Sequence, residues 1–416
     1  MCFASEYLEQ RALFPEILKE APERNTGIII VVPAYNEPGI TKLLNSLSLC
    51  TEPGCKVEVI VVLNAPENAS EESLANNINS RNQIESWKKE NSNCFFRLFA
   101  FIAPAIKGWG VGLARKTGMD EAVRRFNRLN NPEGIILNLD ADCLVSINYL
   151  TEVYYGFEVK ERSACSIYFE HPCEGKEFPE QVYEHIILYE LYLRYYFQGL
   201  AYTGYPYVFH TVGSAIAVKA LPYIKAGGMN RRQAGEDFYF IQKLVPAGGY
   251  FSLNSATVFP SPRPSSRVPF GTGATIARLI ESDESVLYTY DFIAFRELKN
   301  FFGMSDIIFD TKPDDLNIVY DNLPPGLKSF LRKIEFEEKI REIKGNTAGL
   351  LSFRKRFFGW FNMFKIVKFL NFVHLEMYDK VPIQVSAMKL LEEMSLKPRS
   401  AESSDLLEMY RKLERG

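Results

Sequence analysis

Two aspartates have a spacing that could hold a metal ion. Asp140 and Asp142 directly follow Ile135–Leu139, an aliphatic run typical of a buried strand. Residues two apart in an extended chain point to the same side, so both carboxylates project together beyond the strand. Such groups repel each other unless a proton or cation lies between them, and oxygen ligands suit Mg²⁺ or Mn²⁺ bridged to a diphosphate. An acidic turn capping the next helix is the alternative, but the end of a parallel strand favours the metal site.

A second acidic pair, Glu236 and Asp237, follows Gly235 where a helix is expected to begin. The helix dipole alone favours acidic residues at this position, so the pair has a purely structural explanation. The functional alternative is that one of the two carboxylates acts as a general base and takes a proton from an acceptor hydroxyl.

A glycine-rich turn precedes a third candidate group. Lys107, Gly108 and Gly110 lead into a helix expected from about Val111, and Arg115 lies early in that helix. Glycine lets the backbone approach a ligand closely, so Lys107 or Arg115 could contact a phosphate or a ribose. The alternative is an ordinary turn followed by a surface-facing arginine.

Candidate nucleotide contacts follow the first two expected strands. The segment Pro-Ala-Tyr-Asn-Glu includes Pro33, Tyr35 and Glu37, and a loop there could offer backbone groups and an aromatic ring to a base. Asn64 follows the second strand, where its amide could read a base edge. Ordinary turn residues are the alternative at all four positions.

The apolar pattern indicates the elements that would carry these residues. Short β-branched or aliphatic runs alternate with segments of helical periodicity, which predicts a mainly parallel sheet covered by helices. The chain from 274 onward is mainly helical in pattern. We therefore expect a polar lead-in over residues 1–26, an α/β catalytic domain over 27–273 and a helical C-terminal region over 274–416. The expected strands are Ile28–Val32, Val57–Leu63, Phe95–Ile102, Ile135–Leu139 and Ala164–Phe169, and Tyr250–Phe259 holds two short strand candidates.

Composition excludes several classes of protein. The 416 residues carry a formal net charge of −3, which is unlike the strong basic excess of a nucleic-acid binder. Seven scattered cysteines without a CxxC motif argue against a disulfide framework or a thiolate zinc site, and favour a reducing cytoplasm. We find neither a signal-peptide pattern nor an apolar run of about 20 residues that could span a membrane.

Taken in order, these motifs resemble the glycosyltransferase family 2 group of the GT-A fold. The resemblance covers about residues 27–260 and includes PAYNE, Asn64, the glycine turn with Arg115, LDAD and GED. It implies a mixed, mainly parallel sheet flanked by helices, a nucleotide-diphospho-sugar donor, a divalent metal and inversion at the anomeric carbon. By this resemblance Asp140 would lie near the ribose or diphosphate, Asp142 on the metal, and Asp237 would be the base, with Glu236 as the second choice.

The sequence departs from the family pattern at two places. Asn64 stands where the family usually has an aspartate that meets the base, although a uridine donor remains the first choice. Many relatives also supply a histidine ligand for the metal, yet the only histidine after Asp237 is His374. Arg263 and Arg267 lie where that histidine is expected. They could clamp the diphosphate, since arginine forks onto phosphate oxygens, or belong to a solvated Pro-rich loop.

The predicted function is therefore metal-dependent transfer of a sugar, with a UDP-sugar as the favoured donor, to a glycan, lipid-linked or small-molecule acceptor. One alternative is a sugar-1-phosphate nucleotidyltransferase, but the loop after the first strand lacks that group's basic residue. The other alternative is a degenerate transferase domain that acts only as a binding module.

Residues 351–370 combine five basic residues with several aromatic ones and have no acidic residue. If the segment is one helix, Phe353, Phe357, Phe361 and Phe364 share a face. That composition suits peripheral contact with the inner face of a membrane. The alternative is that the phenylalanines pack inside the protein while the lysines face solvent.

Overall fold

The computed structural model describes the whole chain except residues 1, 104–107, 232–234, 266, 268–270 and 283. The chain divides into two compact units, and each is described by itself. The first holds residues 1–183, 209–278 and 415–416, and the second holds 184–208 and 279–414. The second unit thus takes residues 184–208 from inside the segment expected to form the catalytic domain.

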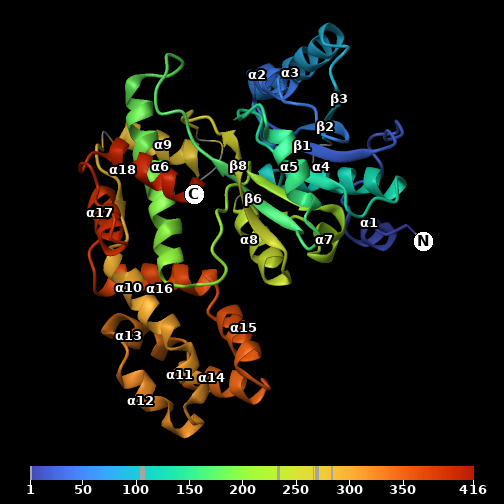
Figure 1. Cartoon of the computed structure of the whole chain (residues 1–416). Helices are drawn as coiled ribbons and strands as arrows, with labels where there is room; N and C mark the ends of the chain where they lie inside the picture. The colour runs from blue at the N-terminus through green and yellow to red at the C-terminus, as the bar shows by residue number, and fades with distance from the viewer. Residues whose placement is uncertain (1, 104–107, 232–234, 266, 268–270, 283) are drawn as a thin grey trace. The chain divides into compact units, whose positions relative to one another are not determined.

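An eight-stranded sheet forms the centre of the first unit, in the order β3-β2-β1-β4-β7-β6-β8-β5 (Figure 1). Among the described residues, β7 and β5 run against the other six strands. This mixed, mainly parallel sheet with flanking helices is the fold class predicted from the sequence. The strands are β1 (Thr26–Ala34), β2 (Lys56–Leu63), β3 (Phe96–Ile102), β4 (Ile135–Asn138), β5 (Leu144–Val145), β6 (Ala164–Phe169), β7 (Ile216–Lys219) and β8 (Tyr250–Phe259).

Helices cover this sheet by packing buried side chains against the strands. In α2, for example, Ile40, Leu43, Leu44 and Leu47 are all fully buried, as their spacing predicts. The helices of this unit are α1 (Ser5–Arg11), α2 (Ile40–Ser48), α3 (Glu71–Glu90), α4 (Val111–Arg128), α5 (Tyr149–Glu158), α7 (Ala220–Lys225) and α8 (Glu236–Leu244), with a 3-10 turn at Val245–Ala247. Two more, α6 (Glu180–Tyr202) and α9 (Thr272–Glu281), extend across the boundary between the units.

Helix α4 packs unusually close to the sheet. A Cβ atom on Gly118 would lie 2.3 Å from Cγ1 of Val31 and 3.0 Å from Cγ2 of Val62, so only glycine fits between the helix and β1 and β2. Ala114 and Ala122 complete this face and are fully buried. The close contact fixes α4, and with it Arg115, relative to the carboxyl ends of the strands.

In the first unit, the sequence pattern gave no strand for β5 or β7 and no helix for α5 or α7, and it misplaced one residue. The expected loop residue Pro33 is a buried strand residue, because β1 continues to Ala34 beside β2. Proline is tolerated there because β4 ends opposite Val31, two residues earlier.

The second unit is mainly helical, as the sequence predicts, with a two-residue antiparallel ladder between β9 and β10. Its elements are β9 (Tyr288–Thr289), α10 (Phe292–Gly303), α11 (Ser305–Asp310), a 3-10 turn (Pro313–Asp315), α12 (Leu316–Asp321), α13 (Pro325–Lys333), α14 (Phe336–Gly345), α15 (Leu350–Trp360), α16 (Met363–Glu376), β10 (Val381–Pro382), α17 (Ile383–Glu393) and α18 (Ser403–Arg415).

The predicted membrane-facing row of phenylalanines is wrong. Phe353, Phe357 and Phe361 are fully buried, and the last two pack on Phe301 at ring distances of 5.4 and 5.1 Å. The physical reason is a break in the helix, because α15 ends at Trp360 and α16 begins at Met363. The four phenylalanines therefore do not share one continuous helix, and the packing alternative holds for these three, while Phe364 is half-buried.

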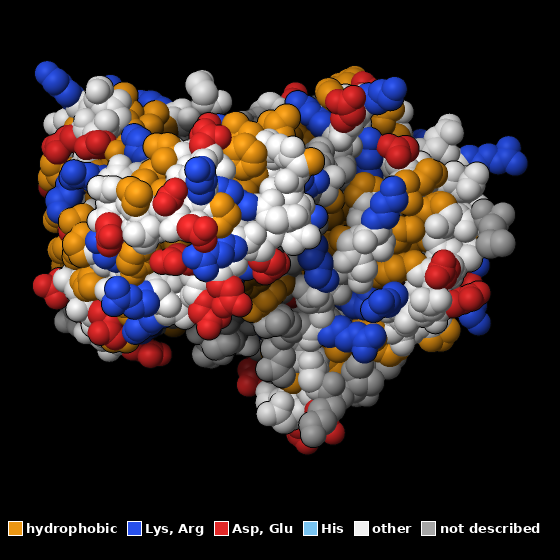
Figure 2. Space-filling view, turned by 90° about the horizontal axis from the view of Figure 1, so that it is seen from below, with side chains coloured by type: hydrophobic (Ala, Val, Ile, Leu, Met, Phe, Trp, Pro, Cys, Tyr) orange, Lys and Arg blue, Asp and Glu red, His pale blue; other side chains and the backbone are white. Residues whose placement is uncertain are grey.

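Charge and hydropathy of the surface agree with the composition. Acidic and basic side chains are interspersed over the face drawn in Figure 2. Within the described part of the chain, every helix is too short or too polar to cross a membrane. All seven cysteines have free thiols in this structure.

We predict that Gly118→Ala destabilises the first unit. The added methyl group would overlap the Val31 side chain, and overpacking of this kind typically costs about 1–3 kcal/mol of unfolding free energy. Chemical denaturation measures the change. Gly359→Ala is the matched control, because nothing lies within 4 Å of its added Cβ and alanine favours helix. Equal stability of the two variants would contradict the close packing.

Candidate active site

Five carboxyl groups gather at the carboxyl ends of the first unit's strands. Glu37 follows β1, Asp140 and Asp142 follow β4, and Glu236 and Asp237 begin α8. Three arginines, from α4 and from the segment after β8, extend into the same group. All these residues belong to the first unit. The structure thus brings together the acidic and arginine candidates that the sequence analysis selected separately.

Arg115 joins the two acidic pairs. Its Nη2 donates to Oδ1 of Asp140 at 2.6 Å, and its Nη1 donates to Oε1 of Glu236. The guanidinium side chain is only 5% exposed and Glu236 only 1%. Burial alone would lower the pKa of Arg115, but the charges of Asp140 and Glu236 raise it. Arg115 is therefore a buried bridge and not the surface-facing arginine of the structural alternative.

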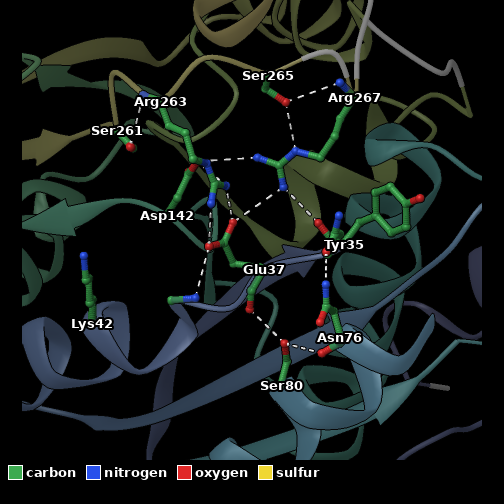
Figure 3. Close-up of polar contacts among 12 residues, drawn as sticks. Tyr35, Glu37, Lys42, Asn76, Ser80, Asp142, Ser261, Arg263, Ser265 and Arg267 are labelled. Carbon is green, nitrogen blue, oxygen red and sulfur yellow. Dashed lines mark hydrogen bonds and ion pairs between the residues drawn. The ribbon is translucent and has the colours of Figure 1, made fainter. Parts of the chain in front are cut away.

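Glu37 and Asp142 share the other two arginines (Figure 3). Arg263 holds Glu37 with both terminal nitrogens, and its Nη2 also lies 3.3 Å from Oδ2 of Asp142. Arg267 Nη1 lies 3.5 Å from Glu37, and its Nη2 is 3.8 Å from Asp142. The Pro-rich segment after β8 is thus joined to the site by ion pairs, and its two arginines lie beside Asp142. Their suggested contact with a diphosphate stays a prediction.

The loop after β1 is held by helix α3. Asn36 adopts a left-handed backbone with φ of 50°, and its N–H donates to Oδ1 of Asn77 at 2.9 Å. Asn76 Nδ2 donates to the side chain of Asn36 at 2.7 Å, and Ser80 Oγ donates to the carbonyl of Glu37 at 2.8 Å. These contacts fix the course of the loop and hence the direction of Glu37.

Tyr35 and Asn64 lie at the ends of the two neighbouring strands. Arg267 Nη1 donates to the carbonyl of Tyr35 at 2.8 Å, and the tyrosine is partly exposed (Figure 3). The backbone of Asn64 bonds to Ala34 and to the side chain of Asn77. Asn64 is only 5% exposed, and its suggested contact with a base stays a prediction.

Asp237 differs from its neighbour Glu236 because it makes no ion pair with Arg115. Its Oδ1 accepts a hydrogen bond from the backbone N–H of Phe238 at 2.7 Å. Burial, and next the charge of Glu236, raise the pKa of Asp237 to about 6, while Arg115 opposes the shift. A half-buried carboxyl group with this pKa can accept a proton near neutral pH.

The acidic pair after β4 has chemistry suited to a divalent cation. Burial, the charge of Asp140 and the charge of Glu37 raise the pKa of Asp142 to about 6, although Arg263 and Arg267 oppose the shift. A carboxyl group whose ionisation is opposed by burial and by neighbouring negative charges is stabilised in its charged form by an added cation. Among the described residues, no cluster of three or more acidic, histidine or cysteine side chains is placed to bind a metal. The assignment of Asp140 and Asp142 as metal ligands stays a prediction.

Lys107, in the glycine turn before α4, lies outside the described residues, so its suggested phosphate contact stays a prediction. Gly108 has a φ of 85°, which favours glycine, and Gly110 precedes the first residue of α4.

The sequence analysis did not select several residues that shape the site. Asn76, Asn77 and Ser80 recur at helical spacing and hold the β1 loop, yet their polarity favoured a loop in the sequence pattern. Gly213 packs against the Arg115 guanidinium, and its small-residue context gave no sign of this. Helical periodicity of the polar residues would have been the available signal for the first three.

Comparison with known proteins finds a family model that matches part of the chain. Residues 29–220 match the model of glycosyl transferase family 2, which confirms the resemblance drawn from the motifs. The matched segment contains Asp140, Asp142 and Arg115, whereas Asp237 and Arg263 lie beyond it. A search of curated protein sequences found no match.

Three solved structures show remote likeness. Staphylococcus aureus TarS residues 1–349 with UDP-GlcNAc has 15% identity and a TM-score of 0.39, over 93% of this chain and 90% of that one. GalNAc-T7 with UDP, GalNAc and Mn²⁺ has 14% identity and a TM-score of 0.38, over 75% and 55%. The Pyrobaculum calidifontis mannosyltransferase PcManGT with GDP-Man and Mn²⁺ has 13% identity and a TM-score of 0.35, over 100% and 94%. Likenesses this remote do not bear on the donor, acceptor or metal of this chain.

We predict that Asp142→Asn stabilises the metal-free protein at pH 7.5. A folded-state pKa of about 6 means that charging Asp142 opposes folding, so the neutral amide removes a cost of up to about 3 kcal/mol. The gain should shrink as the pH falls below about 6, because wild-type Asp142 then binds a proton. Denaturation in chelator-treated buffer measures it, with the exposed Asp314→Asn as control. A less stable Asp142→Asn variant at pH 7.5 would refute this account.

Proposed function

We propose that this chain, whose residues 29–220 match glycosyl transferase family 2, transfers a sugar from a nucleotide-diphospho-sugar to an acceptor hydroxyl. A UDP-sugar is the favoured donor. The observation that carries the proposal is the ion-pair network at the carboxyl ends of the strands. Arg115 joins Asp140 to Glu236, the chain neighbour of Asp237, and Arg263 contacts Asp142. Ligands bind at this edge in open α/β sheets.

The donor diphosphate would meet Arg263 and Arg267. Both side chains are about 30% exposed and already converge on Asp142. Guanidinium groups form paired hydrogen bonds to phosphate oxygens. Glu37 would hold both arginines in place from behind, since it is buried and contacts both. Tyr35 and Asn64, at the ends of β1 and β2, are the proposed contacts for the base.

Asp140 and Asp142 would hold a divalent cation, Mn²⁺ or Mg²⁺. Carboxylate oxygens are suitable ligands for both ions, and waters or diphosphate oxygens would complete the coordination. When bound, the cation supplies positive charge beside the departing diphosphate. Its presence would also favour the ionised form of Asp142, which burial and the neighbouring charges oppose.

Asp237 would act as the general base. The acceptor hydroxyl oxygen forms a bond to the anomeric carbon as the bond from that carbon to the diphosphate oxygen breaks. The hydroxyl proton passes to Asp237, and the nucleoside diphosphate leaves with the electron pair. In-line attack from the opposite side inverts the configuration. The raised pKa of Asp237 supports this assignment over Glu236, whose carboxylate is buried and paired with Arg115.

Nucleotide and metal should bind together. We expect that Mn²⁺ strengthens the binding of UDP to the wild-type protein and that Asp142→Ala removes this increment, because one of two protein ligands is lost. Titration calorimetry with UDP, in chelator and then in Mn²⁺, measures the increment. Metal-assisted binding that persists unchanged in the variant would show that the cation lies elsewhere.

Loss of the base should slow chemistry more than binding. Asp237→Asn is expected to reduce turnover by about two to four orders of magnitude, the range for losing a general base. UDP affinity should stay near the wild-type value. Hydrolysis of a panel of UDP-sugars, with water as the acceptor, serves as the assay and also separates an enzyme from a binding module. Weakened UDP binding with unchanged turnover of the bound complex would exclude Asp237 as the base.

The same assay gives a pH profile. Wild-type turnover should fall as the pH drops through about 6, because Asp237 then carries a proton and cannot accept another. The fall should be absent from the residual activity of Asp237→Asn.

A further inference from the structure

We infer that Arg115 is a positioning residue, not a donor contact, and that Gly213 provides the space in which its guanidinium ties Asp140 to Glu236. The inference deepens the proposed function and rests on it for the catalytic consequence. It starts from the two ion pairs of Arg115, which run in different directions to acids on different elements.

The surroundings of Arg115 argue against contact with a donor. Its side chain is 5% exposed, and both terminal nitrogens already donate to carboxylates. Turning either nitrogen to a phosphate would leave a carboxylate in the site without this counter-charge. Glu236 in particular is buried, and its other oxygen, Oε2, has no hydrogen-bond partner among the described residues. An uncompensated buried charge is strongly destabilising, so Arg115 is held between the two acids.

Gly213 lies directly against the guanidinium. A Cβ atom built on this glycine would lie 2.3 Å from Nη1 of Arg115 and 2.6 Å from Cζ and Nη2. These separations are far below van der Waals contact. Gly213 is not among the residues with a positive φ, so space and not backbone conformation requires glycine here.

The backbone around Gly213 is anchored on both sides. Ala215 donates its N–H to the carbonyl of Val212 at 2.9 Å, and Ile167 of β6 donates to the carbonyl of Ala215 at 2.8 Å. Strand β7 begins at the next residue and pairs with the end of β4, where Ile216 lies opposite Asn138. A side chain added at Gly213 would therefore displace the flexible arginine and not the chain.

The consequence is a fixed relation between the two functional halves of the site. Asp140 belongs to the metal and diphosphate side, and Glu236 is the direct chain neighbour of the proposed base Asp237. With the guanidinium displaced, neither acid keeps this common partner. We expect Gly213→Ala to fold, because only the far end of a flexible side chain must move, yet to impair catalysis.

A double-mutant cycle tests the inference without reference to activity. Gly213→Ala should lower the melting temperature by about 3 °C or more, as expected for roughly 1 kcal/mol of overpacking. In the Arg115→Ala background the same change should lower it by less than about 1 °C, because the overlapping guanidinium is gone. If Arg115→Ala does not fold, Arg115→Lys serves as the background, because lysine keeps the positive charge but lacks the planar guanidinium group. Gly303→Ala, with nothing within 4 Å of its Cβ, is the control.

Hydrolysis of UDP-sugars gives the second readout. Gly213→Ala should reduce turnover at least tenfold in the wild-type background and less than twofold in the Arg115→Ala or Arg115→Lys background. Additive losses of stability would overturn the assignment of Gly213. A clear coupling in stability with full turnover of Gly213→Ala would overturn the positioning role. If wild-type protein hydrolyses no UDP-sugar, the proposed function fails, whereas the melting cycle still decides whether Gly213 seats Arg115.

Discussion

The site depends on the balance of like charges at one edge of the sheet. Its five carboxyl groups come from separate segments and would repel each other if they were brought together without counter-ions. Each arginine resolves this repulsion by bridging acids from two segments: Arg115 joins Asp140 to Glu236, and Arg263 joins Glu37 to Asp142. Because desolvation offsets much of the Coulomb gain of buried ion pairs, their main effect here is on geometry.

Strand order explains why these segments meet. Strand β7 runs against β4, so the residues just before β7 lie beside the residues just after β4. Gly213 precedes the start of β7 and Asp140 follows the end of β4, which places both next to the same guanidinium. Helix α4 positions the Arg115 guanidinium there, because Gly118 lets the helix pack directly on Val31. One close packing contact and one antiparallel strand thus position the bridge.

The sequence predicts the parts of this arrangement that leave a local pattern. The pattern reveals the aliphatic strands that end before Asp140 and before Asn64. It also reveals the helix that carries Arg115 and the acidic start of the helix at Glu236. Contacts between distant segments leave no such pattern. The pairing of Arg263 with Glu37 and the packing of Arg115 against Gly213 could therefore be found only from the structure. The prediction of one exposed row of phenylalanines failed for the same reason. The break between α15 and α16 near Phe361 is set by tertiary packing and not by periodicity.

Burial separates the three arginines into two kinds. Arg115 is enclosed between two acids, so a ligand would have to displace a buried ion pair to reach it. Arg263 and Arg267 are about 30% exposed and share their acids, so each can exchange a carboxylate for a phosphate oxygen at lower cost. An exchange of this kind would leave Asp142 with less counter-charge and thereby raise its affinity for a cation. Phosphate binding at the two exposed arginines and cation binding at Asp142 would then each strengthen the other by the same factor. Arg115 would meanwhile keep Asp140 and Glu236 in place.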